Sequence, residues 1–156
     1  LELVALHRAG DADSDIARQL EQRVRAYPDQ PELKYAMIRL RALSRDAEVR
    51  DSFKALTLAN ELAPNQPTPP NIEALALAAA CDGQYQQAAR LQQQVIGMVK
   101  WMLPAEKLQA LETTLAAYEK DSMPQQPVWP ADDPLLSPLP LNPVEPFRDY
   151  PAAVPF

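Results

Sequence analysis

Histidine and cysteine are almost absent from this chain of 156 residues, which has one of each, His7 and Cys81. A structural zinc site needs several His or Cys ligands at set spacings, and a lone cysteine forms no disulfide within its own chain. A catalytic triad or a Cys-His pair would have to use His7, close to the start of the sequence. Cys81 follows three alanines, which favours a small buried residue over a reactive thiol. We therefore expect no metal site and no catalytic histidine.

Glycine is also scarce, and its three copies are too far apart to form a loop that cradles phosphate. The acidic run at 11–15 matches the first ligands of a calcium loop, but Ile16 and Gln22 occupy the positions that require Gly and Glu. The adjacent Asp132 and Asp133 are expected to stay solvated rather than to form a catalytic pair. These absences predict no enzymatic activity, no cofactor and no small-molecule substrate.

Positive charge is in deficit, since the formal net charge is −6 and residues 121–156 hold −4 of it. A nucleic-acid-binding protein needs a basic stripe, so we expect no nucleic-acid partner. The longest apolar run, Ala74 to Cys81, is far too short to cross a bilayer. One basic run is an exception, and it predicts a solvated helix face or, alternatively, a docking patch for an acidic partner. Its members are Lys34, Arg39, Arg41, Arg45, Arg50 and Lys54.

What the chain has in abundance is alanine, leucine and proline. Only 6% of the residues are aromatic while 47% are hydrophobic, a mixture that favours helices over a β-sandwich. Of the 17 prolines, ten lie between Pro124 and Pro155. We therefore predict an all-α domain over residues 1–121 and an extended, proline-rich tail over 122–156.

Apolar periodicity predicts seven short helices with brief loops, which would pack as antiparallel hairpins. The first ends near Gly10, and the second begins at an Asp13 or Ser14 cap and ends before Pro28. The third runs from Pro31 to about Ser44. The fourth ends before Pro64, the fifth opens at Asn71 or just before it, the sixth reaches Trp101, and the seventh starts at Pro104. The expected buried faces are Ile16-Leu20-Val24-Tyr27, Leu33-Met37-Leu40, Val49-Phe53-Leu56-Asn60, Ile72-Leu75-Ala76-Ala79, Tyr85-Ala88-Gln92-Val95-Val99 and Leu108-Leu111-Leu115-Tyr118.

The helical part contains a repeat. The tetrapeptide at 28–31, Pro-Asp-Gln-Pro, recurs as Pro-Asn-Gln-Pro at 64–67, which is 36 residues later. The segment 72–96 adds an apolar helix with small residues, the turn Gly83-Gln84-Tyr85, two glutamines and Ala88. This segment resembles a tetratricopeptide unit, in which Gly permits the turn, Tyr wedges between two helices and Ala allows close approach.

The resemblance implies about three degenerate tetratricopeptide-like units over residues 1–103, stacked as a short solenoid with the seventh helix as a cap. The first two units lack a clear Gly-Tyr turn, and Ile72 stands where the family has a bulky aromatic residue. An irregular helical bundle is the alternative fold. Stacked units of this kind leave an extended surface that binds other proteins.

The tail is too apolar for a solvated linker, so we expect it to dock on its own helices or on a partner. Its apolar residues are Trp129, Leu135, Leu136, Leu139, Leu141, Val144, Phe147, Tyr150, Val154 and Phe156. The predicted partner-binding residues are Lys34, Arg41, Arg45, Trp129, Leu136, Leu139, Phe147, Tyr150 and Phe156.

The sequence therefore predicts a non-catalytic interaction scaffold or adaptor, a subunit of a larger assembly whose partners are other protein subunits. Its Gln- and Ala-rich style resembles bacterial helical-repeat proteins, often of the cell envelope, without separating periplasm from cytoplasm. The alternative is a regulatory or substrate-recruiting segment of a larger enzyme, because the chain starts at Leu1 and lacks catalytic chemistry. A third hypothesis is a receptor for acidic peptide tails, which would use Arg41 and Arg45.

Overall fold

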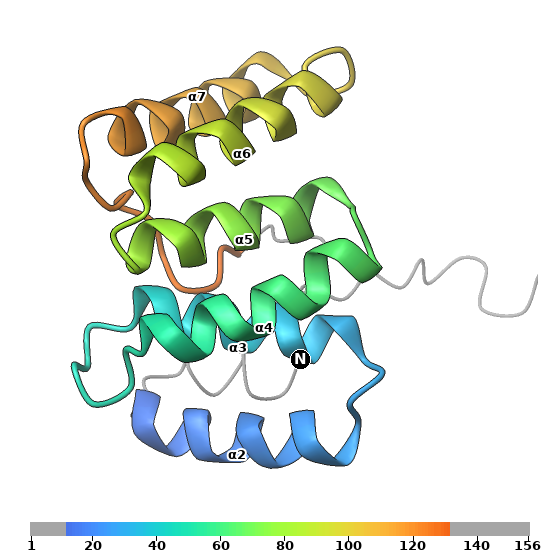
Figure 1. Cartoon of the computed structure of the whole chain (residues 1–156), viewed down its shortest axis with the longest axis vertical. Helices are drawn as coiled ribbons and strands as arrows, with labels where there is room; N and C mark the ends of the chain where they lie inside the picture. The colour runs from blue at the N-terminus through green and yellow to red at the C-terminus, as the bar shows by residue number, and fades with distance from the viewer. Residues whose placement is uncertain (1–11, 132–156) are drawn as a thin grey trace, which may run out of the picture.

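The computed structural model describes residues 12–131, and every regular element in that range is an α-helix (Figure 1). The prediction of an all-α fold is therefore confirmed for this part of the chain. The helix predicted before Gly10 and the tail from residue 132 lie outside the described residues. The six helices are α2 (Asp13–Ala26), α3 (Pro31–Leu43), α4 (Ser52–Asn65), α5 (Pro69–Cys81), α6 (Tyr85–Val99) and α7 (Ala105–Glu119).

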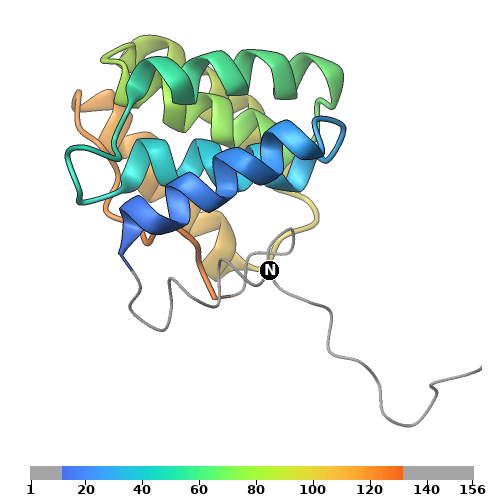
Figure 2. The same ribbon diagram turned by 90° about the horizontal axis from the view of Figure 1, so that it is seen from below.

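The helices form a stack in which each one runs antiparallel to the next and packs against it, and α3 also contacts α5 (Figure 1). Seen from below, α2 lies at the near end of this stack (Figure 2). Because the helices alternate in direction, the α2–α3, α4–α5 and α6–α7 loops share one edge of the molecule. The α3–α4 and α5–α6 loops lie on the opposite edge. Both copies of the Pro-x-Gln-Pro tetrapeptide fall on the first edge, at equivalent junctions.

The centre of the stack is α5, which is buried on nearly all sides. Ala76, Ala78 and Ala79 are completely buried, and Leu77 and Ile72 are nearly so. Alanine side chains keep neighbouring backbones close, because they occupy little space between packed helices. Ala78 packs with residues of α2, α3 and α4, whereas Ala76 and Ala79 pack with residues of α6 and α7. The helix α5 therefore joins two halves of one core.

The face predicted for the sixth helix is confirmed. Ala88, Gln92, Val95 and Val99 are buried along α6, and Tyr85 is half-buried. Gln92 is the only polar member of this face, and its Nε2 donates a hydrogen bond to the carbonyl of Leu111 in α7 at 3.2 Å. A buried amide needs such a partner, so Gln92 fixes α7 against α6.

The face predicted for the fourth helix is only half confirmed, since Val49 is buried and Leu56 packs against the core, but the other two residues are exposed. The Asp51 carboxylate accepts a hydrogen bond from the Lys54 backbone N–H at 3.0 Å, so this cap starts α4 at Ser52 and leaves Val49 in the preceding loop. Phe53 is 76% exposed, and Asn60 is exposed as well. The residues that α4 does bury are mostly small, which explains why a pattern of large apolar side chains missed them. They are Ala55, Ala59, Leu62 and Ala63.

Several predicted helix ends are also shifted. The N-cap of α2 is Ala12, whose methyl side chain has no atom that could cap the helix. The predicted cap residue, Asp13, lies inside the helix, and its carboxylate accepts a hydrogen bond from the Ser44 hydroxyl at the end of α3. Tyr27, expected on the buried face, is 57% exposed beyond the end of α2. Pro64 lies within the last turn of α4, where the Asn65 side chain bonds to the Glu61 carbonyl at 2.8 Å. The helix α5 starts two residues early, at Pro69.

The predicted turn at Gly83 is confirmed, and its geometry explains the glycine. Gly83 has φ of +80°, its N–H donates to Ala80, and the Gln84 N–H donates to Ala79. This pair of bonds is the Schellman motif, which ends α5 with one residue in the left-handed region. A side chain in that region costs roughly 1–2 kcal/mol.

Two glycines provide a matched test of this account, because an added Cβ would meet no atom within 4 Å at either Gly83 or Gly97. We expect Gly83→Ala to lower the free energy of unfolding by about 1 kcal/mol, since it strains the left-handed turn. Gly97→Ala lies inside α6 and should raise it by about 0.8 kcal/mol. Urea denaturation of both variants checks this, and two changes of the same sign would contradict it.

Candidate interaction surface

An extended segment follows α7 and folds back over the stack to reach α3. We call residues 123–129 the strap. The chain leaves α7 through Asp121, which has φ of 53°, and Met123, Val128 and Trp129 then pack into the same core as α2, α3 and α4. The strap lies in the segment predicted to be a tail, and the described part of that segment docks on the chain's own helices. The part beyond residue 131 lies outside the described residues.

Arg39 of α3 holds the strap by its backbone. Its Nε donates a hydrogen bond to the carbonyl of Val128 at 2.6 Å, and its Nη2 donates to the carbonyl of Pro127 at 3.0 Å. The guanidinium also lies over the Tyr35 ring, 5.8 Å from its centroid. Arg39 is only 3% exposed, and a charge this deeply buried must be matched by strong hydrogen-bond acceptors. Two strap carbonyls supply them.

The other anchor of the strap is Trp129. It is 3% exposed, and its indole Nε1 donates a hydrogen bond to the carbonyl of Ala36 in α3 at 3.1 Å. Pro124 and Pro127 keep the strap extended and remove two backbone donors, so the strap offers carbonyls to α3. The helix therefore holds this segment through one large aromatic side chain and two backbone acceptors.

The Tyr118 side chain of α7 places another polar group in the core. It is 1% exposed and packs with alanines of α5 and α6. Burial raises the pKa of the Tyr118 hydroxyl well above its usual range; the Glu73 carboxylate adds to the rise and the Arg39 guanidinium opposes it. The hydroxyl oxygen is buried, and it has no hydrogen-bond partner among residues 12–131. Burying such a group costs free energy, so this hydroxyl is expected to destabilise the fold.

Arg41, a predicted partner-binding residue, points into the protein. It is 7% exposed, its Nη1 donates to the Val49 carbonyl at 2.7 Å, and its Nη2 pairs with the Glu21 carboxylate of α2. Lys54 lies 3.6 Å from the same carboxylate. The predicted solvated basic face is therefore divided, because Arg39 and Arg41 are interior residues that bind helices and strap together.

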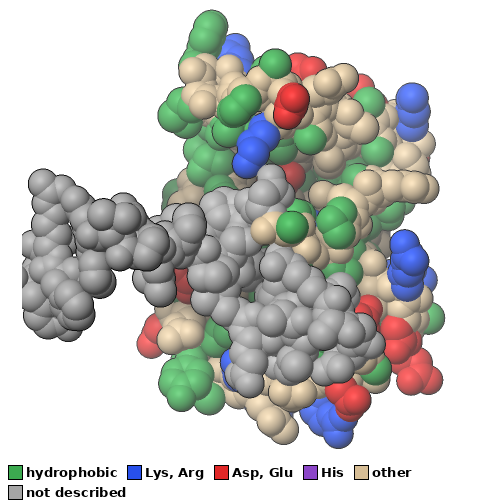
Figure 3. Space-filling view, turned by 180° about the vertical axis from the view of Figure 1, so that it is seen from behind, with side chains coloured by type: hydrophobic (Ala, Val, Ile, Leu, Met, Phe, Trp, Pro, Cys, Tyr) green, Lys and Arg blue, Asp and Glu red, His purple; other side chains and the backbone are tan. Residues whose placement is uncertain are grey.

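Arg45 and Arg50 differ from these interior arginines. Both are exposed in the α3–α4 loop, and neither guanidinium has an ion pair or hydrogen bond in the part of the chain that the structure describes. Both line an open cleft of about 1190 Å³, whose opposite wall includes Gln125 and Gln126 of the strap. Figure 3, seen from behind, shows basic and acidic side chains intermixed around the rim of the molecule.

Cys81 lines the same cleft and is half-buried. Burial raises the pKa of the Cys81 thiol, and the positive charge of Arg50 opposes that rise. A thiol with a raised pKa is a poor nucleophile, which agrees with the structural role expected from its alanine-rich surroundings.

Four of the predicted partner-binding residues lie in the described range, and their surroundings differ. Trp129 and Arg41 are buried, Arg45 is exposed, and Lys34 lies on α3 with its Nζ 3.4 Å from the Glu61 carboxylate of α4. Partner binding by these residues stays a prediction. Five further predicted residues lie outside the described range: Leu136, Leu139, Phe147, Tyr150 and Phe156.

The central role of Arg39 was missed by sequence reasoning, which counted it only as one charge in a basic run. A signal was present, since Tyr35, Ala36 and Arg39 share one helical face with the spacing of i, i+1 and i+4. The other signal is the proline-rich strap itself. Prolines have no backbone N–H, so such a segment has more acceptors than donors, and a buried part of it needs donors from elsewhere in the chain.

Within residues 12–131, no group of three or more His, Cys, Asp or Glu side chains is arranged to hold a metal ion. None of the described helices has the length and apolar character needed to span a bilayer. Comparison with protein-family models, with curated proteins and with solved structures gives no match to this chain.

The two tryptophans test the strap. We expect Trp129→Ala to lower the free energy of unfolding by about 3 kcal/mol, because it empties a buried site and removes the bond to Ala36. Trp101→Ala is the control; Trp101 is 84% exposed, so the change should stay below about 0.5 kcal/mol. Chemical denaturation followed by circular dichroism measures both, and equal effects would mean that the strap is not docked.

Replacement of Tyr118 by Phe tests the buried hydroxyl. Because the hydroxyl has no partner in the described part of the chain, Tyr118→Phe should raise the free energy of unfolding by about 1 kcal/mol at neutral pH. The raised pKa has a second consequence: the unfolded chain loses the tyrosine proton first, above about pH 10, so stability is complete below that pH and falls above it. Tyr118→Phe should reduce this alkaline loss.

The control for Tyr118 is Tyr27→Phe. Because Tyr27 is exposed, this change should alter neither the free energy of unfolding at neutral pH nor its fall at alkaline pH. Denaturation from neutral pH to pH values above the usual pKa of tyrosine gives both results. A Tyr118→Phe variant that is less stable than the parent at neutral pH would show that the hydroxyl has a stabilising partner.

Proposed function

We propose that this chain is a non-catalytic scaffold of a larger, bacterial assembly and that it binds other protein subunits through its helical surface and proline-rich tail. The single observation that carries the proposal is the way in which α3 holds the strap. Arg39 donates hydrogen bonds to two backbone carbonyls of the strap, and Trp129 is buried and bonded to Ala36. The surface of α3 around Ala36 and Arg39 therefore holds an extended, proline-rich segment. Helical surfaces that bind such segments by backbone and one aromatic anchor serve as protein-interaction sites.

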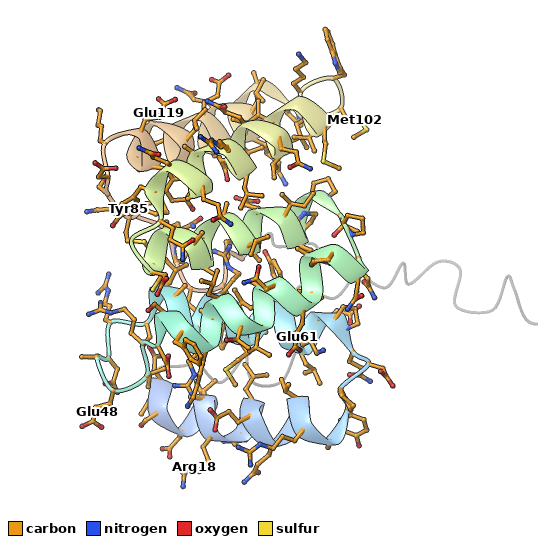
Figure 4. The ribbon with its side chains drawn as sticks, in the orientation of Figure 1. Arg18, Glu48, Glu61, Tyr85, Met102 and Glu119 are labelled. Atoms are coloured by element: carbon orange, nitrogen blue, oxygen red, sulfur yellow. The ribbon has the colours of Figure 1, made fainter. Side chains whose placement is uncertain are left out.

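The proposal includes a tetratricopeptide-like organisation of degenerate helical hairpins. It is supported by the antiparallel order of α3 to α6, by the Gly83 turn and by the completely buried Ala88. Tyr85, half-buried at the start of α6, lies at the edge of the stack that carries the α5–α6 loop (Figure 4). This is the position at which the resemblance puts a wedge between the two helices of a unit.

We assign Arg45 and Arg50 to the binding of an acidic segment of the partner, because both line the cleft beside the strap and neither guanidinium is paired with a residue between 12 and 131. An arginine of this kind is available for bidentate contacts with carboxylates. Arg41 is unsuited to the role that the sequence assigned to it, because its charge is already matched by Glu21. Its reversal would leave a buried carboxylate unpaired and would disturb the fold rather than test binding.

Charge reversal provides the test. Crosslinking and affinity capture from the native source should recover a defined neighbouring protein with the parent chain, and the Arg45→Glu/Arg50→Glu variant should recover roughly tenfold less, as expected for lost charge pairs in an interface. Arg90→Glu is the matched control, because Arg90 is also an exposed arginine and lies on α6, outside this cleft. Equal recovery by all three chains would contradict the assignment of the two arginines.

A truncated chain tests binding by the tail separately from binding by the helices. A chain that ends at Ala131 keeps the strap and loses the predicted tail contacts at Leu136, Leu139, Phe147, Tyr150 and Phe156. If those residues bind a neighbour, the truncated chain should recover less of it while its thermal unfolding stays unchanged. Failure of every chain to recover a neighbour in a fixed ratio would overturn the scaffold function itself.

A further inference from the structure

Large apolar side chains are concentrated at one loop of the molecule. Of the five large hydrophobic residues that are exposed among the described residues, three lie where α6 ends: Met98 at 40%, Trp101 at 84% and Met102 at 73%. We call Met98, Lys100, Trp101 and Met102 the α6–α7 tip. Figure 4 shows Met102 at the outer end of the loop, directed away from the stack, and Figure 3 shows hydrophobic and basic side chains projecting at this end.

The exposure of the tip is fixed by its backbone. Val99 is buried, and its carbonyl accepts hydrogen bonds from the N–H groups of Met102 at 2.9 Å and Leu103 at 3.1 Å. The turn thus runs from the buried Val99 to the half-buried Leu103. Because both of its ends are anchored, Trp101 and Met102 must face outward. The apolar side chains are therefore presented by an ordered turn.

The charge of the tip differs from that of the whole chain. Lys100 holds its Nζ 4.9 Å from the centroid of the Trp101 ring. Between Met98 and Lys107 the sequence has two lysines and one glutamate, a net charge of +1 within a chain of −6. A positive, aromatic tip on an acidic protein is complementary to a negatively charged surface.

We propose that the α6–α7 tip docks on an anionic lipid surface. Trp101 and Met102 would enter the boundary between headgroups and acyl chains, where indole rings are favoured, and Lys100 would extend its ammonium group to the lipid phosphates. The shape of the tip favours lipid over a protein partner. It is a convex end with three apolar side chains, whereas a stable protein interface needs about 800 Å² from each partner.

Vesicles provide the test. The full chain should sediment with vesicles of phosphatidylcholine and phosphatidylglycerol, bind less to phosphatidylcholine alone, and lose binding as salt is raised. The Trp101→Ala/Met102→Ala variant should bind roughly tenfold more weakly, as expected when two inserted apolar side chains are removed. Phe53→Ala is the control, because Phe53 is 76% exposed at the opposite edge of the stack and should leave binding unchanged.

Fluorescence shows whether Trp101 itself enters the lipid. The difference between the spectra of the parent chain and Trp101→Phe isolates the exposed indole, since the buried Trp129 is common to both. This difference spectrum should shift to shorter wavelengths with anionic vesicles and be quenched by brominated lipids. Three outcomes would overturn the proposal: no sedimentation with anionic vesicles, equal sedimentation of parent and double variant, or capture of a soluble protein through Trp101 without lipid binding.

Discussion

The buried guanidinium of Arg39 is the constraint on which the described fold most depends. A positive charge that is 3% exposed on a packed helix needs acceptors at fixed positions, and the nearest helices use their own carbonyls within their own hydrogen bonds. The strap supplies the missing acceptors at Val128 and Pro127. Because the strap follows α7, this contact ties the end of the helical stack to α3 near its beginning. The strap thereby adds a long-range contact to the packing of consecutive helices and of α3 with α5.

The second requirement is that the helices approach closely enough for one core to form. Alanine dominates α5 and the inner face of α4, so the space between helices is narrow and few large side chains are needed to fill it. Tyr118 and Trp129 then supply bulk at the two sides of α5. Most of the core is therefore built from small side chains, and a few large ones fill the remaining space.

Much of the fold could be predicted from the sequence, since proline, glycine and apolar periodicity act locally. Pro31, Gly83 and Pro104 mark helix boundaries within a residue or two, and the buried face of α6 follows its 3.6-residue period. The face of α4 could be predicted only in part, because a pattern of large apolar residues overlooks its buried alanines and includes the exposed Phe53. Local patterns also say nothing about which helix a distant segment contacts.

The candidate site was harder to predict for the same reason. The apolar composition around Trp129 indicated that this segment docks, but its acceptor on α3 is a backbone carbonyl, which has no sequence signature. The roles of the arginines depend on their neighbours in space: Arg41 meets Glu21 across two helices, while Arg45 meets no acidic side chain in the described range. The sequence assigned all of these arginines to one basic run. In the structure Arg39 holds the strap, Arg41 joins α3 to α2, and Arg45 is exposed.

Hydrogen exchange of the two indole N–H groups tests the docked strap most directly. The Trp129 N–H is buried and bonded to Ala36, and the Trp101 side chain is exposed, so the full chain should show one indole proton protected against exchange and one that exchanges freely. Replacing Arg39 with Met should reduce the protection of Trp129 and leave Trp101 unchanged. Two freely exchanging indole protons in the unmodified chain would contradict a strap held on α3.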